Sequence, residues 1–238
     1  EIPGLMKASV AGLDDSSLLN QGFKIGLNNP KAWGRNALKS FVDIYGTLTG
    51  KEMMREVRAF VFSRKNQMNG VYKKHGLYFG NEEAFPTSVL AKLPLIGKLY
   101  EASETAYTGF IHRNRAEIFD YLYENAKKNG LDTKGLGELV NSITGRGNMG
   151  SLEKNSDFIN VVLFSGRYLK SNIDMLTFHA SSWGRNSMSP YVKKIAARNT
   201  VIAYAALVAQ AYLAAMITSA FSGEDFENPD PRSSETFQ

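Results

Sequence analysis

Apolar positions recur at helical spacing along most of this chain, with Gly, Pro and Asn between the periodic stretches. Residues 1–28 hold only short apolar pairs among Gly, Ser and Asp, so they predict an irregular lead-in. Asn29-Pro30 then supplies a helix cap followed by a proline at the first helical position. The pattern predicts a helix from this point to about Tyr45, ending before Gly46.

The next stretches continue the helical pattern with less regular interruptions. A second helix is predicted at about Lys51–Arg64, and the mixed stretch Asn66–Gly80 predicts a shorter helix that ends near Gly76. Two prolines bracket a short segment, Thr87–Leu93. The longest amphipathic run is Leu99–Asn129, and Asn129-Gly130 is a typical C-terminal stop.

Three shorter helices are predicted at Lys134–Ile143, Asp157–Phe164 and Tyr168–Phe178. Within the second of these, Val161–Phe164 is alternatively a buried strand, because periodicity does not separate short apolar runs. Ser189-Pro190 opens the last helix. Since no alternating strands recur, we predict an all-α fold, an irregular multi-helix bundle with a long apolar C-terminal helix.

The most apolar stretch is Thr200–Ser222, which contains no charged residue, no Pro and no Gly. Its many Ala residues favour a helix, and a helix of this length spans roughly 30 Å, the thickness of a bilayer's hydrocarbon core. Two interpretations stay open. The segment either inserts into a membrane or is a packing helix covered on all sides by protein.

The charges on either side of this stretch are asymmetric. A soluble helix prefers acids near its N-terminus and bases near its C-terminus, because of its dipole. This chain has the opposite order, which is what the positive-inside rule produces around a membrane span. The bases that come first, and are candidate membrane-flanking residues, are Lys193, Lys194 and Arg198, and the acids that follow are Glu224, Asp225, Glu227 and Asp230.

Composition adds three limits. The net charge of +5 permits contact with DNA or anionic lipid without requiring either. The absence of Cys excludes disulfides, thiolate metal sites and a Cys nucleophile. Without an initiator Met or a signal peptide, the chain is expected to be a fragment or a processed product. We divide it into the lead-in 1–28, a helical domain 29–222 and an extended acidic tail 223–238.

The string Gly145-Arg-Gly-Asn-Met-Gly150 matches the spacing of the dinucleotide-binding fingerprint. That fingerprint works only between a strand and a helix, and here the preceding residues predict a helix. We therefore interpret Gly145, Gly147 and Gly150 as a turn between helices, in which Gly supplies positive φ angles.

Gly-Arg pairs occur at 34–35, 145–146, 166–167 and 184–185. Their arginines either tie loop carbonyls together where Gly bends the chain, or bind phosphates or carboxylates of a partner. The candidate structural or partner-binding residues are Thr144, Gly145, Arg146, Gly147 and Arg167.

No catalytic arrangement is recognised in the sequence. The three histidines lie far apart without metal-ligand spacing, the carboxylates are scattered, and no phosphate-binding loop or nucleophile elbow is present. We expect no enzyme, no metal and no cofactor. Arg113 and Arg115 alternate with aromatic residues in 100–123, which fits either stacking on nucleic-acid bases or the core and rim of a helical packing surface.

Five strings point to one family: Glu101–Phe110, Arg115–Asp120, Val140–Gly147, Leu163–Arg167 and Asp230–Ser234. In this order and spacing they resemble a helical region near the C-terminal end of very large bacteriophage polyvalent proteins. The resemblance covers residues 30–238. Family members usually have Pro in place of Gly166, and they continue beyond the Arg-Ser-Ser string, whereas this chain ends at Gln238.

The resemblance implies a protein that travels in the virion and enters the host with the DNA, with no catalytic residue in this region. We therefore expect a non-enzymatic structural or ejection component of a bacteriophage particle, helical and oligomerising, which inserts into the host membrane on DNA delivery. Its expected location is the phage virion and, after ejection, the host cell envelope. Its expected partners are other phage virion proteins or copies of itself, together with the host membrane and DNA.

An alternative function stays open beside this one. The chain is then a nucleic-acid-binding helical module of a large phage polyprotein. In that case the residues that contact phosphates are Arg113, Arg115, Arg146 and Arg167.

Overall fold

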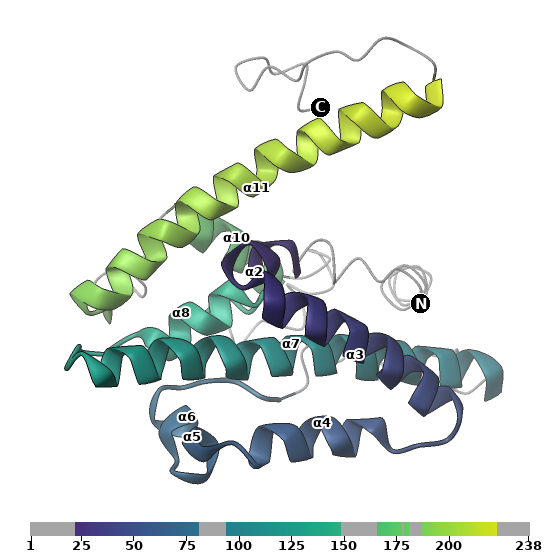
Figure 1. Cartoon of the computed structure of the whole chain (residues 1–238), viewed down its shortest axis with the longest axis horizontal. Coiled ribbons are helices and arrows are strands. Elements are labelled where there is room, and N and C mark those ends of the chain that lie inside the picture. Colours follow the sequence, from purple (N-terminus) through teal and green to yellow (C-terminus); the bar gives the residue numbers. More distant parts are fainter. Residues whose placement is uncertain (1–21, 81–93, 149–165, 178, 181–186, 223–238) are drawn as a thin grey trace.

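The described residues of this computed structural model are 22–80, 94–148, 166–177, 179–180 and 187–222, and they form nine helices and no strand (Figure 1). This confirms the predicted all-α fold with a long apolar C-terminal helix. The helices are α2 (Gly22–Asn28), α3 (Pro30–Leu48), α4 (Met53–Phe62), α5 (Lys65–Met68), α6 (Val71–Lys74), α7 (Pro94–Lys128), α8 (Leu136–Ile143), α10 (Gly166–Leu176) and α11 (Pro190–Ser222).

Helix α7 is the axis of the fold, because α3, α4 and α8 all pack against it (Figure 1). Helix α11 packs mainly on α2, α10 and α8 through its first half, and its second half projects away from the other helices. The core therefore lies around the middle of α7, and the long apolar helix α11 extends from the edge of the helices that pack around it.

Local signals set several helix ends as predicted. The Asn29 side chain caps α3 by accepting a hydrogen bond from the Ala32 backbone N–H at 3.1 Å, and Pro30 is the first helical residue. Helix α7 ends at Lys128, two residues before Gly130, which has a φ of 63°, and the Leu131 N–H bonds back to the Ala126 carbonyl at 2.9 Å. This is the Schellman pattern, in which a left-handed residue turns the chain and satisfies a late helical carbonyl.

The predicted end of α3 before Gly46 is wrong, because the helix continues to Leu48. Gly46 is buried where α3 meets the start of α4, and a Cβ added to it would lie 2.4 Å from Met53 Sδ. The stop is Gly50, with a φ of 86°, followed by a Lys51 N–H bond to the Gly46 carbonyl at 2.9 Å. Gly46 thus serves helix packing and Gly50 serves the turn.

Other predictions have mixed outcomes. An irregular lead-in over 1–28 is wrong for residues 22–28, which form α2. The stretch before Gly76 holds two short helices, α5 and α6, in place of one. The predicted segments at 87–93 and 157–164 and the tail 223–238 lie outside the described residues.

Aromatic residues of α7 form the centre of the core. Phe110 and Phe119 are fully buried, and the Phe119 ring meets Tyr72 edge-on with 5.4 Å between the ring centroids. Tyr121, by contrast, is 67% exposed. Most of the aromatic pattern in 100–123 is therefore explained by packing.

The interface between α3 and α7 is polar and buried. Arg113 binds Asp43 through two parallel hydrogen bonds, Nη1 to Oδ2 at 2.6 Å and Nη2 to Oδ1 at 2.9 Å. Beside this pair, the Asn36 amide donates to Asn114 Oδ1 at 3.1 Å. A Cβ at Gly109 would lie 2.8 Å from Asp43 Oδ2, so the absence of a side chain there makes room for the ion pair.

Candidate functional site

The loop after α8 follows the predicted turn geometry at its first glycine. Gly145 has a φ of 87°, and the Arg146 N–H bonds to the Asn141 carbonyl at 2.8 Å, which closes α8 with another Schellman motif. Gly145 therefore has the role that the sequence predicted. Gly150 lies outside the described residues.

The predicted positive φ angle is wrong for Gly147, which instead permits a close approach. Its N–H donates to the Arg167 carbonyl at 3.0 Å. A Cβ at this position would lie 2.6 Å from the Ser171 backbone nitrogen and 2.8 Å from the Lys170 carbonyl carbon. The loop thus lies directly against the first turns of α10, and the two Gly-Arg strings that contain Arg146 and Arg167 meet in space.

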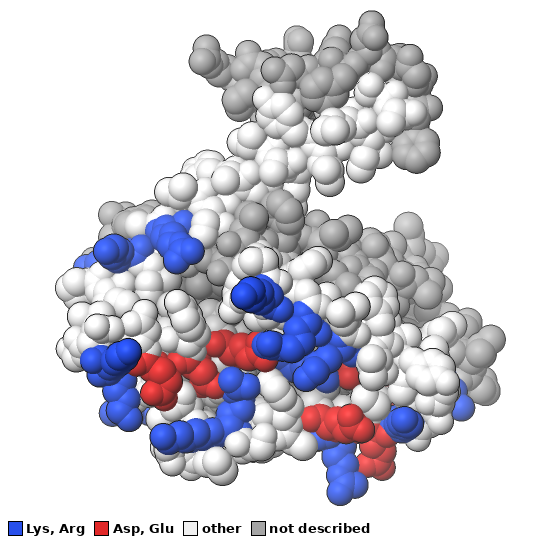
Figure 2. Space-filling view, viewed as in Figure 1, with Lys and Arg blue, Asp and Glu red and all other residues white. Residues whose placement is uncertain are grey.

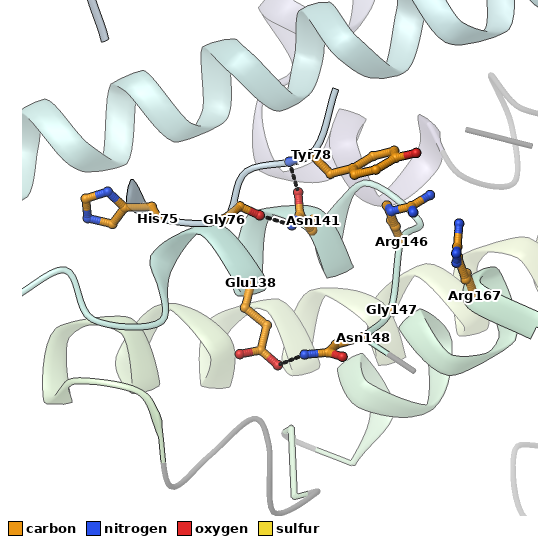
Figure 3. Close-up of a pocket in the computed structure, with 9 residues that line it drawn as sticks. All are labelled: His75, Gly76, Tyr78, Glu138, Asn141, Arg146, Gly147, Asn148 and Arg167. Atoms are coloured by element: carbon orange, nitrogen blue, oxygen red, sulfur yellow. Dashed lines mark hydrogen bonds between the residues drawn. The ribbon is translucent and has the colours of Figure 1, made fainter. Parts of the chain in front are cut away.

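A pocket of about 390 Å³ lies where these strings meet (Figure 3). The Arg146 guanidinium carbon lies 3.3 Å from the centroid of the Tyr78 ring, a cation–π contact that fixes the plane of the guanidinium. Figure 3 shows Arg146 and Arg167 next to each other at one end of the pocket. The lining residues are His75, Gly76, Tyr78, Glu138, Asn141, Arg146, Gly147, Asn148 and Arg167.

The other walls of the pocket are held by polar contacts. Asn141 accepts a hydrogen bond from the Tyr78 N–H at 3.1 Å and donates to the Gly76 carbonyl at 2.9 Å, which ties the 76–78 loop to α8. Burial raises the pKa of the Glu138 carboxyl, and the hydrogen bond from the Asn148 amide at 3.2 Å opposes that shift.

Two adjacent guanidiniums beside a tyrosine are chemically suited to a carboxylate or a phosphate group. Arg146 also has a structural contact, which is with the Tyr78 ring and differs from the loop carbonyls that the sequence predicted as partners. Partner binding at Arg146 and Arg167 stays a prediction.

Thr144 acts inside the fold together with Arg115. The Arg115 side chain is completely buried, and its Nε donates to Thr144 Oγ1 at 2.7 Å while its Nη1 donates to the Tyr78 carbonyl at 2.7 Å. Arg113 is likewise buried, on Asp43. Neither arginine is on the surface, so the expectation that these two residues contact nucleic-acid phosphates is wrong. The sequence pattern alone does not show that these two arginines are buried.

The first half of α11 is attached to the body by one narrow stripe. Two hydroxyls add to this attachment, Thr200 Oγ1 to the Met175 carbonyl at 2.6 Å and Tyr204 OH to the Leu176 carbonyl at 3.2 Å. The buried positions of the stripe alternate at intervals of four and three residues, and they are Val192, Ala196, Asn199, Ala203 and Ala206.

After Ala206, none of the described positions of α11 is buried. The helix is long and apolar enough to cross a membrane, and of its most apolar stretch of 18 residues only 11% is buried in the described part of the chain. The described residues of this chain therefore do not cover the helix, and the packing interpretation needs cover from outside them, either from the rest of this chain or from a second protein. Of the candidate membrane-flanking residues, Lys194 and Arg198 are exposed and Lys193 is half-buried.

Comparisons with protein-family models, curated proteins and solved structures find no match for this chain.

Replacing Gly147 with Ala is expected to lower the free energy of unfolding by about 1–3 kcal/mol, because the new methyl group overlaps backbone atoms of α10 that have no rotamer to change. Chemical denaturation measures the effect. Gly34→Ala is the matched control, because a Cβ at this helical position has nothing within 4 Å and should stabilise α3 by up to about 1 kcal/mol. Equal effects of the two substitutions would contradict the close approach at Gly147.

Proposed function

We propose that this chain is a non-enzymatic helical component of a bacteriophage particle that binds the host membrane through α11. The observation that carries the membrane part is the projecting apolar half of this helix (Figure 1). The phage setting rests on the resemblance of the sequence strings.

The apolar surface of the projecting half surrounds the helix. At 100° per residue, Leu207, Val208, Leu213, Met216 and Ile217 fall on all sides of the axis, and each is between 38% and 60% exposed. A helix that packs on one neighbour in water needs only one apolar stripe with a polar back. An apolar surface on every side instead suits hydrocarbon, which contacts the whole circumference.

The basic residues before the apolar segment agree with this proposal. Lys194 and Arg198 are exposed just before the apolar surface begins, and basic side chains at that depth bind anionic lipid headgroups. In Figure 2, basic side chains gather at the start of α11, and its projecting half shows neither basic nor acidic side chains on this face. The projecting half therefore offers an uncharged surface to a bilayer.

The alternative function, a nucleic-acid-binding module, has less support. Arg113 is buried on Asp43, and Arg115 is buried on Thr144, so neither side chain can reach a phosphate. It predicts DNA binding whose affinity falls steeply between low and moderate salt. Titration of labelled duplex DNA at two salt concentrations tests it.

The membrane proposal is tested by flotation of the full chain with vesicles of phosphatidylcholine and phosphatidylglycerol, after purification in mild detergent. We expect the chain to float with the vesicles and to stay bound after a high-salt wash, because apolar insertion is not screened by salt. A chain that stays at the bottom of the gradient contradicts the proposal. Mass spectrometry of purified phage particles tests the virion part independently, by the presence or absence of this chain.

A further inference from the structure

Helix α3 has a reversed distribution of polar and apolar residues. Its buried face carries Asn36, Ser40 and Asp43, which pack on the polar part of α7. The opposite face carries large apolar side chains, with exposed fractions of 70% for Leu38, 55% for Phe41, 59% for Val42 and 69% for Tyr45. A helix on the surface of a protein in water normally shows the opposite arrangement.

The exposed apolar residues form one continuous stripe. Leu38, Phe41, Val42 and Tyr45 follow the spacing i, i+3, i+4 and i+7, which places them on a single face, and Leu48 extends the stripe to the end of the helix. Contiguous apolar patches of this kind mark sites where another surface binds. We call these five residues the α3 stripe.

The charges around the α3 stripe indicate the partner. Lys31, Arg35 and Lys39 are exposed in the first half of α3, and the one acid of the helix, Asp43, is buried on Arg113. Arg35 also bonds Glu117, at 2.5 Å. The exposed charges of α3 itself are thus all positive. Apolar residues with lysine and arginine beside them are typical of helices that lie in the headgroup region of an anionic bilayer.

We propose that the α3 stripe is a second lipid-binding surface, which lies flat on an anionic bilayer with Lys31 and Lys39 among the phosphate headgroups. The inference takes its partner from the proposed function, but it concerns a different surface from α11. Figure 2 shows basic side chains over the first half of α3 and at the start of α11 on the same face of the molecule. Both groups of bases are therefore accessible from the same side of the molecule.

The absence of Cys allows a direct test with single labels. An environment-sensitive fluorophore such as NBD is attached to Val42→Cys in the α3 stripe, to Leu213→Cys in α11 and to Lys74→Cys, an exposed control position in α6. Each labelled full-length chain is mixed with anionic vesicles. We expect a blue shift and an increase of emission at positions 42 and 213, and no change at position 74.

The outcomes separate the two proposals. A shift at position 213 without one at position 42 overturns the α3 inference and leaves the proposed function standing. A shift at position 42 alone overturns membrane binding by α11 and leaves the α3 stripe as the lipid-binding surface. A blue shift at position 42 that grows with protein concentration in the absence of lipid means that a second copy covers the stripe, and this also overturns the inference.

A charge variant tests the headgroup contact. Lys31→Gln with Lys39→Gln should weaken binding to anionic vesicles by roughly fivefold for each charge removed, and should leave binding to neutral vesicles unchanged. The matched control is Lys127→Gln with Lys128→Gln, two exposed lysines at the end of α7. An equal loss for both pairs would mean that only the net charge matters, which overturns the specific placement of α3.

Discussion

Leu213→Asp combined with Ile217→Asp is expected to reduce partitioning of the chain into vesicles by at least about a hundredfold. Placing one Asp at the centre of a membrane helix costs about 2.5–3.5 kcal/mol, and a second Asp one turn away adds a similar cost. Both positions lie in the projecting half of α11 and are at least half exposed, so the body should fold unchanged. Flotation with anionic vesicles measures the effect, and circular dichroism checks the fold.

The control for this variant is Met68→Asp, which adds one Asp, half of the added charge, at a position that is 68% exposed at the end of α5. It should float like the unmodified chain. Ala206 is unsuitable for such a test because it is only 4% exposed and packs on the body. If the α11 double variant and the Met68 variant float equally, insertion of α11 is wrong.

The second large effect is expected at the ion pair between α3 and α7. Asp43→Ala should lower the free energy of unfolding by about 3–5 kcal/mol, because it leaves the Arg113 guanidinium buried without its carboxylate. Arg113→Ala should cost a similar amount for the reciprocal reason. Chemical denaturation of each variant measures the two losses.

The double replacement Asp43→Leu with Arg113→Met separates a charge effect from a packing effect. Because no charge is then left buried, the loss should be smaller than for either single alanine variant. The salt bridge between Arg55 and Glu52 on the surface is the matched control, since both side chains are mostly exposed and removing either should change stability by less than about 1 kcal/mol. Losses that add up across the buried pair would contradict this account.

Local rules were sufficient for several features of the fold. The cap at Asn29, the first-turn Pro30 and the stop at Gly130 depend on residues within one turn, so the sequence pattern predicted them. The end of α3 was missed because two glycines follow each other closely there. The contact of Met53 with Gly46, which decides between them, is tertiary and leaves no local signal.

The candidate site was predictable only in part. The Gly-Arg strings drew attention to Arg146 and Arg167, but nothing in the sequence shows that Gly147 brings them together against α10. Arg115 illustrates the opposite error. Its aromatic neighbours fitted either a surface that stacks on bases, with Arg115 on phosphates, or a helical packing surface, and the structure shows Thr144 and the Tyr78 carbonyl holding its guanidinium inside the fold.

The exposure of α11 was the feature that sequence left most open. An apolar, Ala-rich helix suits a protein core and a bilayer equally well, because both remove it from water. Whether the helix is a core helix or a membrane helix depends on which other helices pack against it. In the described part of the chain, they reach it only as far as Ala206.

Depth-dependent quenching of a fluorophore at Leu213→Cys tests the central claim most directly. The full-length chain, bound to anionic vesicles, is exposed in turn to a nitroxide on the lipid tails and to aqueous iodide, with Lys74→Cys as the control position. Insertion predicts strong nitroxide quenching and little iodide quenching at position 213, and the reverse at position 74. Strong iodide quenching and weak nitroxide quenching at position 213 on the vesicles would contradict membrane binding by α11.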